Sequence, residues 1–271
     1  MASLLECTRF SIQDVRRRLE TPAVGQHLYL LDQVESTNVS LRAIARAGGA
    51  EGTVLVAESQ THGRGRHGGP WFSPAGVNLY ASVLFRPSFR PREAAPFSFV
   101  ASLAMCDALR ELGGEPGIKW PNDVLLGGRK VAGTLLECAT RGHEIDYLLL
   151  GVGVNLNVEA GALRAALGES GLAATSVAEE LGGTIDRSAF TASYLNHLGR
   201  WVSRHLASGP EAICAAWRTR DILTGRRVEV RGSHASFEGW ARGVDTEGRL
   251  LVEAFCGGRR TVTSEEVRIL D

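Results

Sequence analysis

The apolar positions in the first third of the chain form short runs that glycine, proline and polar residues interrupt. Ser11, followed by Asp14, has the spacing of a helix cap and predicts a short helix that continues to about Glu20. A second helix is predicted after Ser36-Thr37-Asn38, and Gly48-Gly49 ends it. Runs rich in aliphatic, β-branched and aromatic residues predict strands at residues 27–34, 53–58 and 79–85. Between the last two strands, residues 59–78 show no periodicity, which predicts a long functional loop.

The middle of the chain changes from a long apolar helix to a group of strands. The helix is predicted at residues 96–112, and its nearly uniform apolar surface predicts packing beneath a sheet. Strands are predicted at residues 118–120, 124–126, 131–139 and 145–156, with Gly127-Gly128 as a tight hairpin turn. Helices follow near Leu163 and at residues 177–181, 187–206 and 210–220.

After Thr224-Gly225 the chain reads as short strands about ten residues apart. They are predicted at residues 227–230, 237–244, 250–255 and 260–263. Such spacing is typical of a small β-barrel. We therefore expect two domains, residues 1–223 and residues 224–271.

Composition limits the class of protein. The 271 residues include 44% hydrophobic and 22% charged residues, as in a soluble globular protein, and this excludes disorder, collagen and a transmembrane bundle. The 30 basic and 30 acidic residues balance, so no basic excess is available for a nucleic-acid backbone. Glu6, Arg9 and Asp14 interrupt the stretch where a signal peptide would be apolar, so we expect a cytoplasmic protein without a membrane partner.

Cysteine and lysine usage adds two observations. The five cysteines are scattered without a C-x-x-C pair, which predicts reduced, mostly buried thiols and no metal site. Of the 30 basic residues, two are lysines, Lys119 and Lys130, and 28 are arginines. A lysine that persists in such a chain indicates a place where a compact ammonium is needed, although two incidental surface charges remain the simpler alternative.

The glycine-rich segment at residues 63–68 matches G-x-G-x-x-G after a predicted strand. A dinucleotide-binding turn must open a helix, however, and Pro70 and Pro74 forbid one. The alternatives are a flexible surface loop and an anion site, because Arg64 and Arg66 alternate with glycines that let backbone amides approach an anion.

Two further segments carry candidate chemistry. Pro121 interrupts two strand-like runs and places Asn122 and Asp123 at a strand end. This arrangement is either a bulge with a capping asparagine or a rigid amide and carboxylate for a metal-bound phosphate. The glycines within residues 151–157 weaken an apolar strand and indicate close approach by a ligand or another backbone.

Six motifs together resemble, in order and spacing, those of the biotin protein ligases. They are residues 36–38, 60–68 with 71–74, 78–80, 119–123, 129–133 and 151–155. The resemblance covers residues 28–157 densely and the C-terminal barrel in general shape. It implies an α+β fold, with a mixed-sheet catalytic domain like those of the biotin and lipoyl ligases and a small C-terminal SH3-like barrel.

The resemblance also implies an activity and a site. The family joins biotin to ATP as biotinyl-AMP, releases pyrophosphate with Mg²⁺, and passes the acyl group to a lysine of a biotin carboxyl carrier protein. The implied catalytic residues are Lys130, Arg66 and Asp123, and no protein side chain is implied as a metal ligand. The implied binding residues are Ser36, Thr37, Asn38, Gln60, Gly63, Arg64, Gly65, Arg66, Trp71, Lys130, Asn122 and Asn155.

Within this set, the resemblance places Thr37, Gln60 and Arg66 at the biotin ureido and carboxylate groups. Asn122, Asp123 and Asn155 belong to the ATP side, and Trp71 is an aromatic surface near the adenylate.

Two positions depart from the family pattern, and they affect the expected contacts. His62 stands where alanine is common, and Gly69 stands where a further arginine often follows. About 25 residues precede the first predicted strand, so we expect a form without the DNA-binding domain of regulatory members, and no specific DNA partner. A homodimer is compatible with the resemblance. The alternatives are a lipoyl or octanoyl ligase of the same superfamily and a non-catalytic biotin-sensing regulator.

Overall fold

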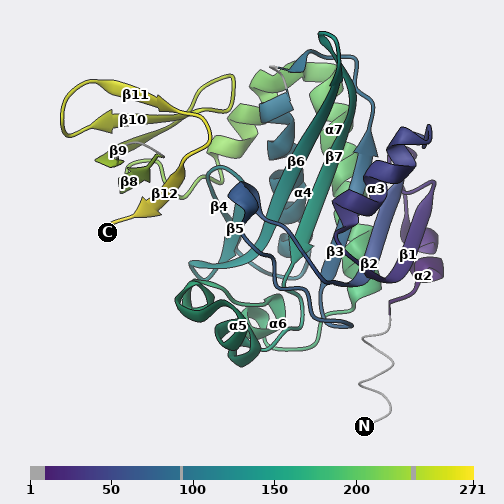
Figure 1. The fold of residues 1–271 in the computed structure, drawn as a ribbon. Coiled ribbons are helices and arrows are strands. Elements are labelled where there is room, and N and C mark those ends of the chain that lie inside the picture. Colours follow the sequence, from purple (N-terminus) through teal and green to yellow (C-terminus); the bar gives the residue numbers. More distant parts are fainter. Residues whose placement is uncertain (1–9, 92–93, 233–235) are drawn as a thin grey trace.

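The computed structural model describes residues 10–91, 94–232 and 236–271, which form a seven-stranded sheet flanked by helices and a five-stranded C-terminal sheet (Figure 1). The order of the larger sheet is β1-β2-β3-β7-β6-β5-β4. Its strands are β1 (Leu28–Val34), β2 (Val54–Gln60), β3 (Leu79–Phe85), β4 (Gly117–Lys119), β5 (Asp123–Leu126), β6 (Arg129–Arg141) and β7 (Glu144–Val154).

The larger sheet is mixed, which confirms the expected fold class. β1 and β2 run parallel, and every other neighbouring pair runs antiparallel. β6 and β7 form a long central hairpin, so the glycines of both strands lie in the middle of the sheet.

Helices cover both faces of this sheet. The helices of the described residues are α2 (Ile12–Arg18), α3 (Thr37–Arg46), α4 (Ala94–Glu111), α5 (Ala160–Leu167), α6 (Val177–Leu181) and α7 (Arg187–Arg218). α4 and α7 pack together behind the sheet, whereas α3 lies on the opposite face (Figure 1). α4 buries most of its surface, as its apolar sequence predicts.

Two local predictions about helices are confirmed. The Ser11 side chain accepts a hydrogen bond from the Asp14 backbone and caps α2. The run Arg187–Arg218, for which the sequence predicts two helices, is broken at Gly209, where φ is 74°. Only glycine adopts that angle readily, and Pro210 supplies no backbone donor to continue the helix.

The C-terminal sheet has the order β11-β10-β9-β8-β12. Its strands are β8 (Arg227–Arg231), β9 (Ser236–Val244), β10 (Leu250–Ala254), β11 (Arg259–Val262) and β12 (Glu266–Ile269). The sequence interpretation missed β12, because a charged four-residue strand with one buried valine, Val267, carries almost no periodic signal.

The C-terminal sheet packs tightly against the larger part of the molecule. Its inward side chains, such as Val252, belong to the same apolar cluster as Phe99 of α4 and Trp217 of α7. The Trp120 indole nitrogen donates to the Gly248 carbonyl at 2.9 Å, in the turn between β9 and β10. The two parts of the chain therefore share one core.

The cysteines only partly match their expected burial. Cys106 and Cys214 are buried free thiols, but Cys138 and Cys256 are exposed, so "mostly buried" is wrong for the four thiols that the structure describes. Cys7 lies outside the described residues. No helix in the described ranges is both long and apolar enough to cross a membrane.

Candidate active site

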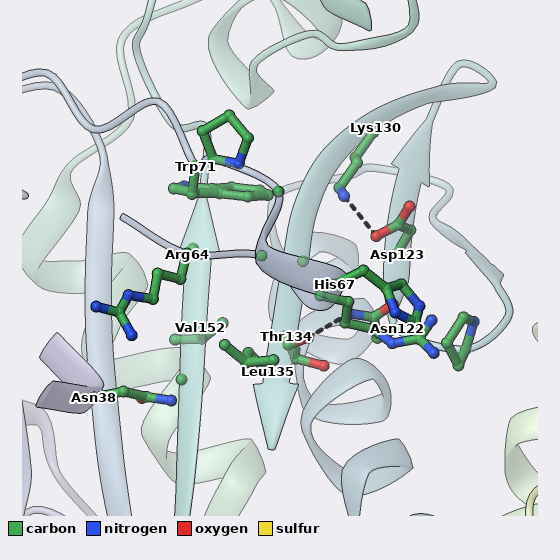
Figure 2. A pocket seen from close by; sticks show the side chains of 18 of the residues that line it. Asn38, Arg64, His67, Trp71, Asn122, Asp123, Lys130, Thr134, Leu135 and Val152 are labelled. Carbon is green, nitrogen blue, oxygen red and sulfur yellow. Dashed lines mark hydrogen bonds and ion pairs between the residues drawn. The ribbon is translucent and has the colours of Figure 1, made fainter. Parts of the chain in front are cut away.

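A cavity of about 380 Å³ lies above the centre of the larger sheet and collects most of the residues that the motifs predict. Asn38 and Arg64 lie toward one end of it, and Lys130, Asp123 and Asn122 lie toward the other (Figure 2). Strand residues of β6 and β7 form the floor between them. The cavity therefore joins two chemically different ends.

The first end carries a group of buried, uncharged polar side chains, beside the half-exposed Arg64. Ser36, Thr37 and Asn38, at the start of α3, are each only 4% exposed. Gln60, at the end of β2, accepts a hydrogen bond from the Thr37 backbone amide at 2.9 Å and donates to the Ser73 hydroxyl at 2.9 Å. Amide and hydroxyl groups of this kind bind a neutral polar head group without adding net charge.

The glycine-rich loop closes on itself beside the cavity. Gly65 donates to the Gly69 carbonyl at 2.7 Å, and Trp71 donates to the Gly63 carbonyl at 2.8 Å. A single 3₁₀ turn, Arg66–Gly68, stands where a dinucleotide fingerprint would need a long helix, as the sequence predicts. Within this turn His67 has a φ of 55°, an uncommon conformation for a residue with a side chain.

The two arginines of this loop point to different partners. Arg64 makes a 2.6 Å ion pair with Glu35, and both side chains are about half exposed. The Arg66 guanidinium donates to the Ser264 carbonyl of the C-terminal part at 2.8 Å and lies 5.8 Å from the centre of the Trp120 ring. Arg66 thus bridges the loop and the C-terminal sheet.

Burial and nearby carboxylates have opposite effects on the pKa of Arg66. Burial lowers the pKa of the Arg66 guanidinium from its ordinary value, while the carboxylates of Asp123 and Glu265 raise it. Burial also raises the pKa of Glu265, but backbone hydrogen bonds and Arg66 outweigh it and hold that pKa below its usual value. Arginine stays protonated in proteins, so Arg66 supplies a fixed positive charge to the cavity.

The opposite end carries Lys130. Its Nζ lies 2.6 Å from Asp123 Oδ1 and 5.2 Å from the centre of the Trp71 ring. The indole rests on Gly133 and Gly153, which are paired across β6 and β7. A Cβ at Gly153 would lie 2.4 Å from the Trp71 ring, and one at Gly133 would lie 3.1 Å from it. These glycines therefore make room for the indole; the sequence predicts a close approach at Gly153, but by a ligand or another backbone rather than by a side chain.

The position of Lys130 corrects one expectation. Strict alternation along the strand predicts that Lys130 shares a face with Ala132 and Thr134. The structure instead places Lys130 over Gly133, because Val131 is an extra residue where β5 and β6 change register. Such a bulge reverses the facing of the residues beyond it, and alternation alone cannot reveal it.

Of the implied site residues, only Gly63 and Asn155 lie outside the cavity wall. A Cβ at Gly63 would lie 2.5 Å from the Trp71 carbonyl oxygen, so this glycine closes the loop. The buried Asn155 side chain donates to the Thr175 carbonyl at 3.0 Å. Asn122 lines the cavity, and its side chain donates to the Thr134 carbonyl.

Sequence reasoning missed three wall residues from the C-terminal part, Glu265, Glu266 and Val267. No sequence signal points to them, because they lie in and beside the strand that was not predicted. The described residues also contain no group of three His, Cys, Asp or Glu side chains that could hold a metal ion. The Asp123 carboxylate is already paired with Lys130.

Comparison with known proteins gives consistent matches. The sequence profile of the Biotin/lipoate A/B protein ligase family matches residues 30–155. The biotin--[acetyl-CoA-carboxylase] ligase of Paracoccus denitrificans is 37% identical, over 88% of this chain and 98% of its own length. The biotin--[acetyl-CoA-carboxylase] ligase of Mycobacterium tuberculosis is 35% identical, over 88% of this chain and 87% of its own length.

A solved structure has a similar fold. The biotin protein ligase from Aquifex aeolicus, in complex with biotin and ATP, superposes with a TM-score of 0.75 and 25% identity. The match covers 90% of this chain and 99% of that one.

Proposed function

Because this chain belongs to the biotin protein ligases of the biotin/lipoate A/B ligase family, we propose that it activates biotin as biotinyl-AMP and transfers it to a carrier protein. The acceptor is a specific lysine of a biotin carboxyl carrier protein. We place the reaction in the cytoplasm, where MgATP is available. We also propose that residues 1–223 form the catalytic domain and residues 224–271 an SH3-like barrel.

One observation carries this proposal: a single cavity runs from a group of buried, uncharged polar side chains, Ser36, Thr37 and Asn38, to the Lys130 ammonium. Biotin has the matching polarity, with a neutral ureido head, an aliphatic chain and a terminal carboxylate. Thr37 and Gln60 are available for the ureido group. The chain would then extend toward Lys130, where its carboxylate meets ATP.

In the first step, a carboxylate oxygen of biotin attacks the α-phosphorus of ATP. The new bond is an acyl–phosphate bond, the bond to the bridging oxygen of the β-phosphate breaks, and pyrophosphate leaves. Two unit anions about 4 Å apart repel by about 4 kcal/mol at an effective dielectric near 20. Lys130, Arg66 and Lys119 all line the cavity, and they supply the opposing positive charge before the reactants arrive.

The nucleotide side of the cavity is defined by Trp71, Asn122 and Asp123. The indole face offers a stacking surface, and the Asp123 carboxylate orients the Lys130 ammonium toward the α-phosphate. The Mg²⁺ ion enters with the ATP phosphates, because Mg²⁺ commonly binds through substrate phosphates and a few protein contacts. In the second step the carrier lysine loses its ammonium proton and attacks the acyl carbon as a free amine. The bond from that carbon to the phosphate oxygen breaks, AMP leaves, and the new amide nitrogen releases a second proton.

The same polarity argues against lipoate as the preferred acid. The lipoyl dithiolane has no hydrogen-bonding group, so Ser36, Thr37, Asn38 and Gln60 would face an apolar ring. Leaving polar groups unpaired against a ligand strongly reduces binding.

Pyrophosphate release tests the proposal and its alternatives. The protein is incubated with MgATP and either biotin or lipoate, and adenylate formation is followed by released pyrophosphate. We expect release with biotin, and we expect lipoate to compete poorly. Release with lipoate alone would support the lipoyl ligase, and biotin binding without release would support the biotin-sensing regulator.

A further inference from the structure

A chain of side-chain hydrogen bonds runs from behind the cavity to its buried polar end. Arg42 Nη2 lies 2.9 Å from Glu137 Oε1, and Asn38 Nδ2 lies 2.7 Å from Glu137 Oε2. On its other side, Asn38 Oδ1 lies 2.5 Å from Ser82 Oγ, which lies 2.7 Å from Thr37 Oγ1. Thr37 and Asn38 line the cavity, whereas Arg42 and Glu137 do not.

The middle of this chain is enclosed. Ser82 is fully buried and Asn38 is 4% exposed, so water does not replace a lost partner there. Gly151 of β7 lets the Asn38 amide lie against the sheet, because a Cβ at that position would lie 2.6 Å from Asn38 Oδ1. Glu137 and Arg42 are each about one-third exposed and close the chain on the outside.

The direction of every hydrogen bond follows from Glu137. Its carboxylate, ion-paired with Arg42, only accepts hydrogen bonds, so Asn38 must turn its amide nitrogen toward it and its carbonyl oxygen toward Ser82. Ser82 has a single hydroxyl proton, and that proton goes to Asn38 Oδ1, which cannot donate. The Thr37 hydroxyl then gives its proton to Ser82.

Thr37 is thereby left with lone pairs and no free proton. Its Oγ1 lies 3.4 Å from Gln60 Oε1, which already accepts from the Thr37 backbone amide. In this order no proton lies between the two oxygens, and the cavity presents a pair of acceptors. An N–H donor of a bound ligand satisfies such a pair.

We propose that Glu137 is a positioning residue that fixes this order of hydrogen bonds, so that Thr37 offers an acceptor to a ring N–H of the biotin ureido group. The inference rests on the proposed function, because it assigns a hydrogen-bond direction to the biotin end of the same cavity. Glu137 itself does not touch the ligand.

Glu137→Gln reverses the order with no change in side-chain size. Arg42 only donates, so the introduced amide oxygen faces Arg42 and the introduced amide nitrogen faces Asn38. Asn38 then turns its own nitrogen toward Ser82, Ser82 donates to Thr37, and the Thr37 proton points toward Gln60 and the ligand. We expect the Kd for biotin, measured calorimetrically without ATP, to rise about tenfold or more, since a ureido N–H then meets a donor.

A second substitution restores the order by a different route. Asn38→Asp alone places two carboxylates in contact and should weaken biotin binding. When Asn38→Asp is combined with Glu137→Gln, the amide introduced at position 137 donates to the carboxylate introduced at position 38. The second oxygen of that carboxylate again accepts from Ser82. We expect the double variant to bind biotin more tightly than either single variant, because each buried group again has a partner of the right kind.

The matched control is Glu253→Gln in the C-terminal sheet. Glu253 forms an exposed ion pair with Arg242 at 2.7 Å, and neither residue lines the cavity. It should leave the Kd for biotin unchanged. In steady-state adenylate formation, Glu137→Gln should raise KM for biotin much more than it lowers kcat, because Lys130 and Arg66 are untouched.

The outcomes separate this inference from the proposed function. A parent protein that does not bind biotin contradicts the proposed function itself. A parent that binds biotin, with an unchanged Kd in Glu137→Gln, overturns the inference alone, and so does a double variant that fails to recover. If thermal unfolding shows that Glu137→Gln is not folded, Ser82→Ala is measured instead. It breaks the same order of hydrogen bonds and leaves the ion pair between Arg42 and Glu137 in place. An unchanged Kd in Ser82→Ala would also overturn the inference.

Discussion

Substitution of Lys130 perturbs the proposed reaction centre most directly. Lys130→Arg keeps the positive charge but replaces a compact ammonium with a planar guanidinium, and Lys130→Gln removes the charge. Both variants should fold, because Lys130 lies at the cavity wall and about one-third of its side chain is exposed. Both should lose adenylate formation.

The magnitude follows from the position of the charge. A unit charge about 3 Å from an oxygen anion contributes up to ~5 kcal/mol at an effective dielectric near 20. Solvent reaches the partly exposed Lys130 side chain and reduces this value. Removing one preorganised group of this kind typically costs about 2.7–4 kcal/mol, or about 10²–10³ in rate, and we expect losses in that range.

The surroundings explain why arginine should not substitute. The Lys130 side chain passes over Gly133, where an added Cβ would lie 3.3 Å from Lys130 Cε, and the longer, planar arginine would carry its charge past this position. Asp123, 2.6 Å from the ammonium, would bind a guanidinium in a bidentate way and draw it from the phosphate. Lys130→Gln also leaves the Asp123 carboxylate unpaired, so that this carboxylate repels the phosphates. The double variant Lys130→Gln with Asp123→Asn removes this repulsion and measures the loss of the Lys130 charge alone.

The assay is biotin-dependent pyrophosphate release under single-turnover conditions, with biotin affinity and thermal unfolding as folding controls. Lys119→Arg is the matched control, because Lys119 also lines the cavity but lies at the end of β4, and it should lose less activity. If Lys130→Arg forms biotinyl-AMP at the parent rate, the role assigned to Lys130 is wrong.

Four further predictions concern the loop, the indole and the C-terminal sheet. Residues 62–71 should be mobile without ligand, because three of the six residues at 63–68 are glycine, and biotin should protect Arg64 and Arg66 from trypsin; equal cleavage rates would contradict this. Gly153→Ala should displace the Trp71 ring, which lies 2.4 Å from the new Cβ position, and raise KM for ATP with little change in biotin affinity; an unchanged KM would argue against stacking. Trp120→Phe removes the hydrogen bond to Gly248 and should lower the free energy of unfolding by about 1 kcal/mol. Deletion of residues 224–271 should destabilise the protein or raise KM for ATP or carrier. Normal stability and kinetics in the truncated protein would refute both a structural and a functional role of the C-terminal sheet.

Periodicity predicted most of the elements, because most are either amphipathic or continuously apolar. The helix from residue 94 to 111 and the β6–β7 hairpin are long enough for their patterns to be unambiguous. The break at Gly209 was predictable for a different reason, since glycine followed by proline carries its own conformational signal. The four-residue strand β12 has too few positions to show a pattern.

The candidate site was predictable only where its residues lie within one motif. The cavity brings together wall residues at 36–38, 60, 64–67, 69–71, 119–123 and 130, which come from the motifs. The facing of Lys130 was not predictable, because the bulge at Val131 depends on pairing between strands. Glu137 was invisible because its partner Asn38 lies 99 positions away. Glu265 was invisible because it lies beside the strand that was not predicted.

The most direct test of the account is the mass of a carboxyl carrier domain after incubation with the protein, biotin and MgATP. We expect a mass increase of one biotinyl group on one lysine of the carrier, dependent on ATP and greatly slowed in Lys130→Gln. A carrier that stays unmodified while the protein binds both biotin and ATP would contradict the proposed ligase function.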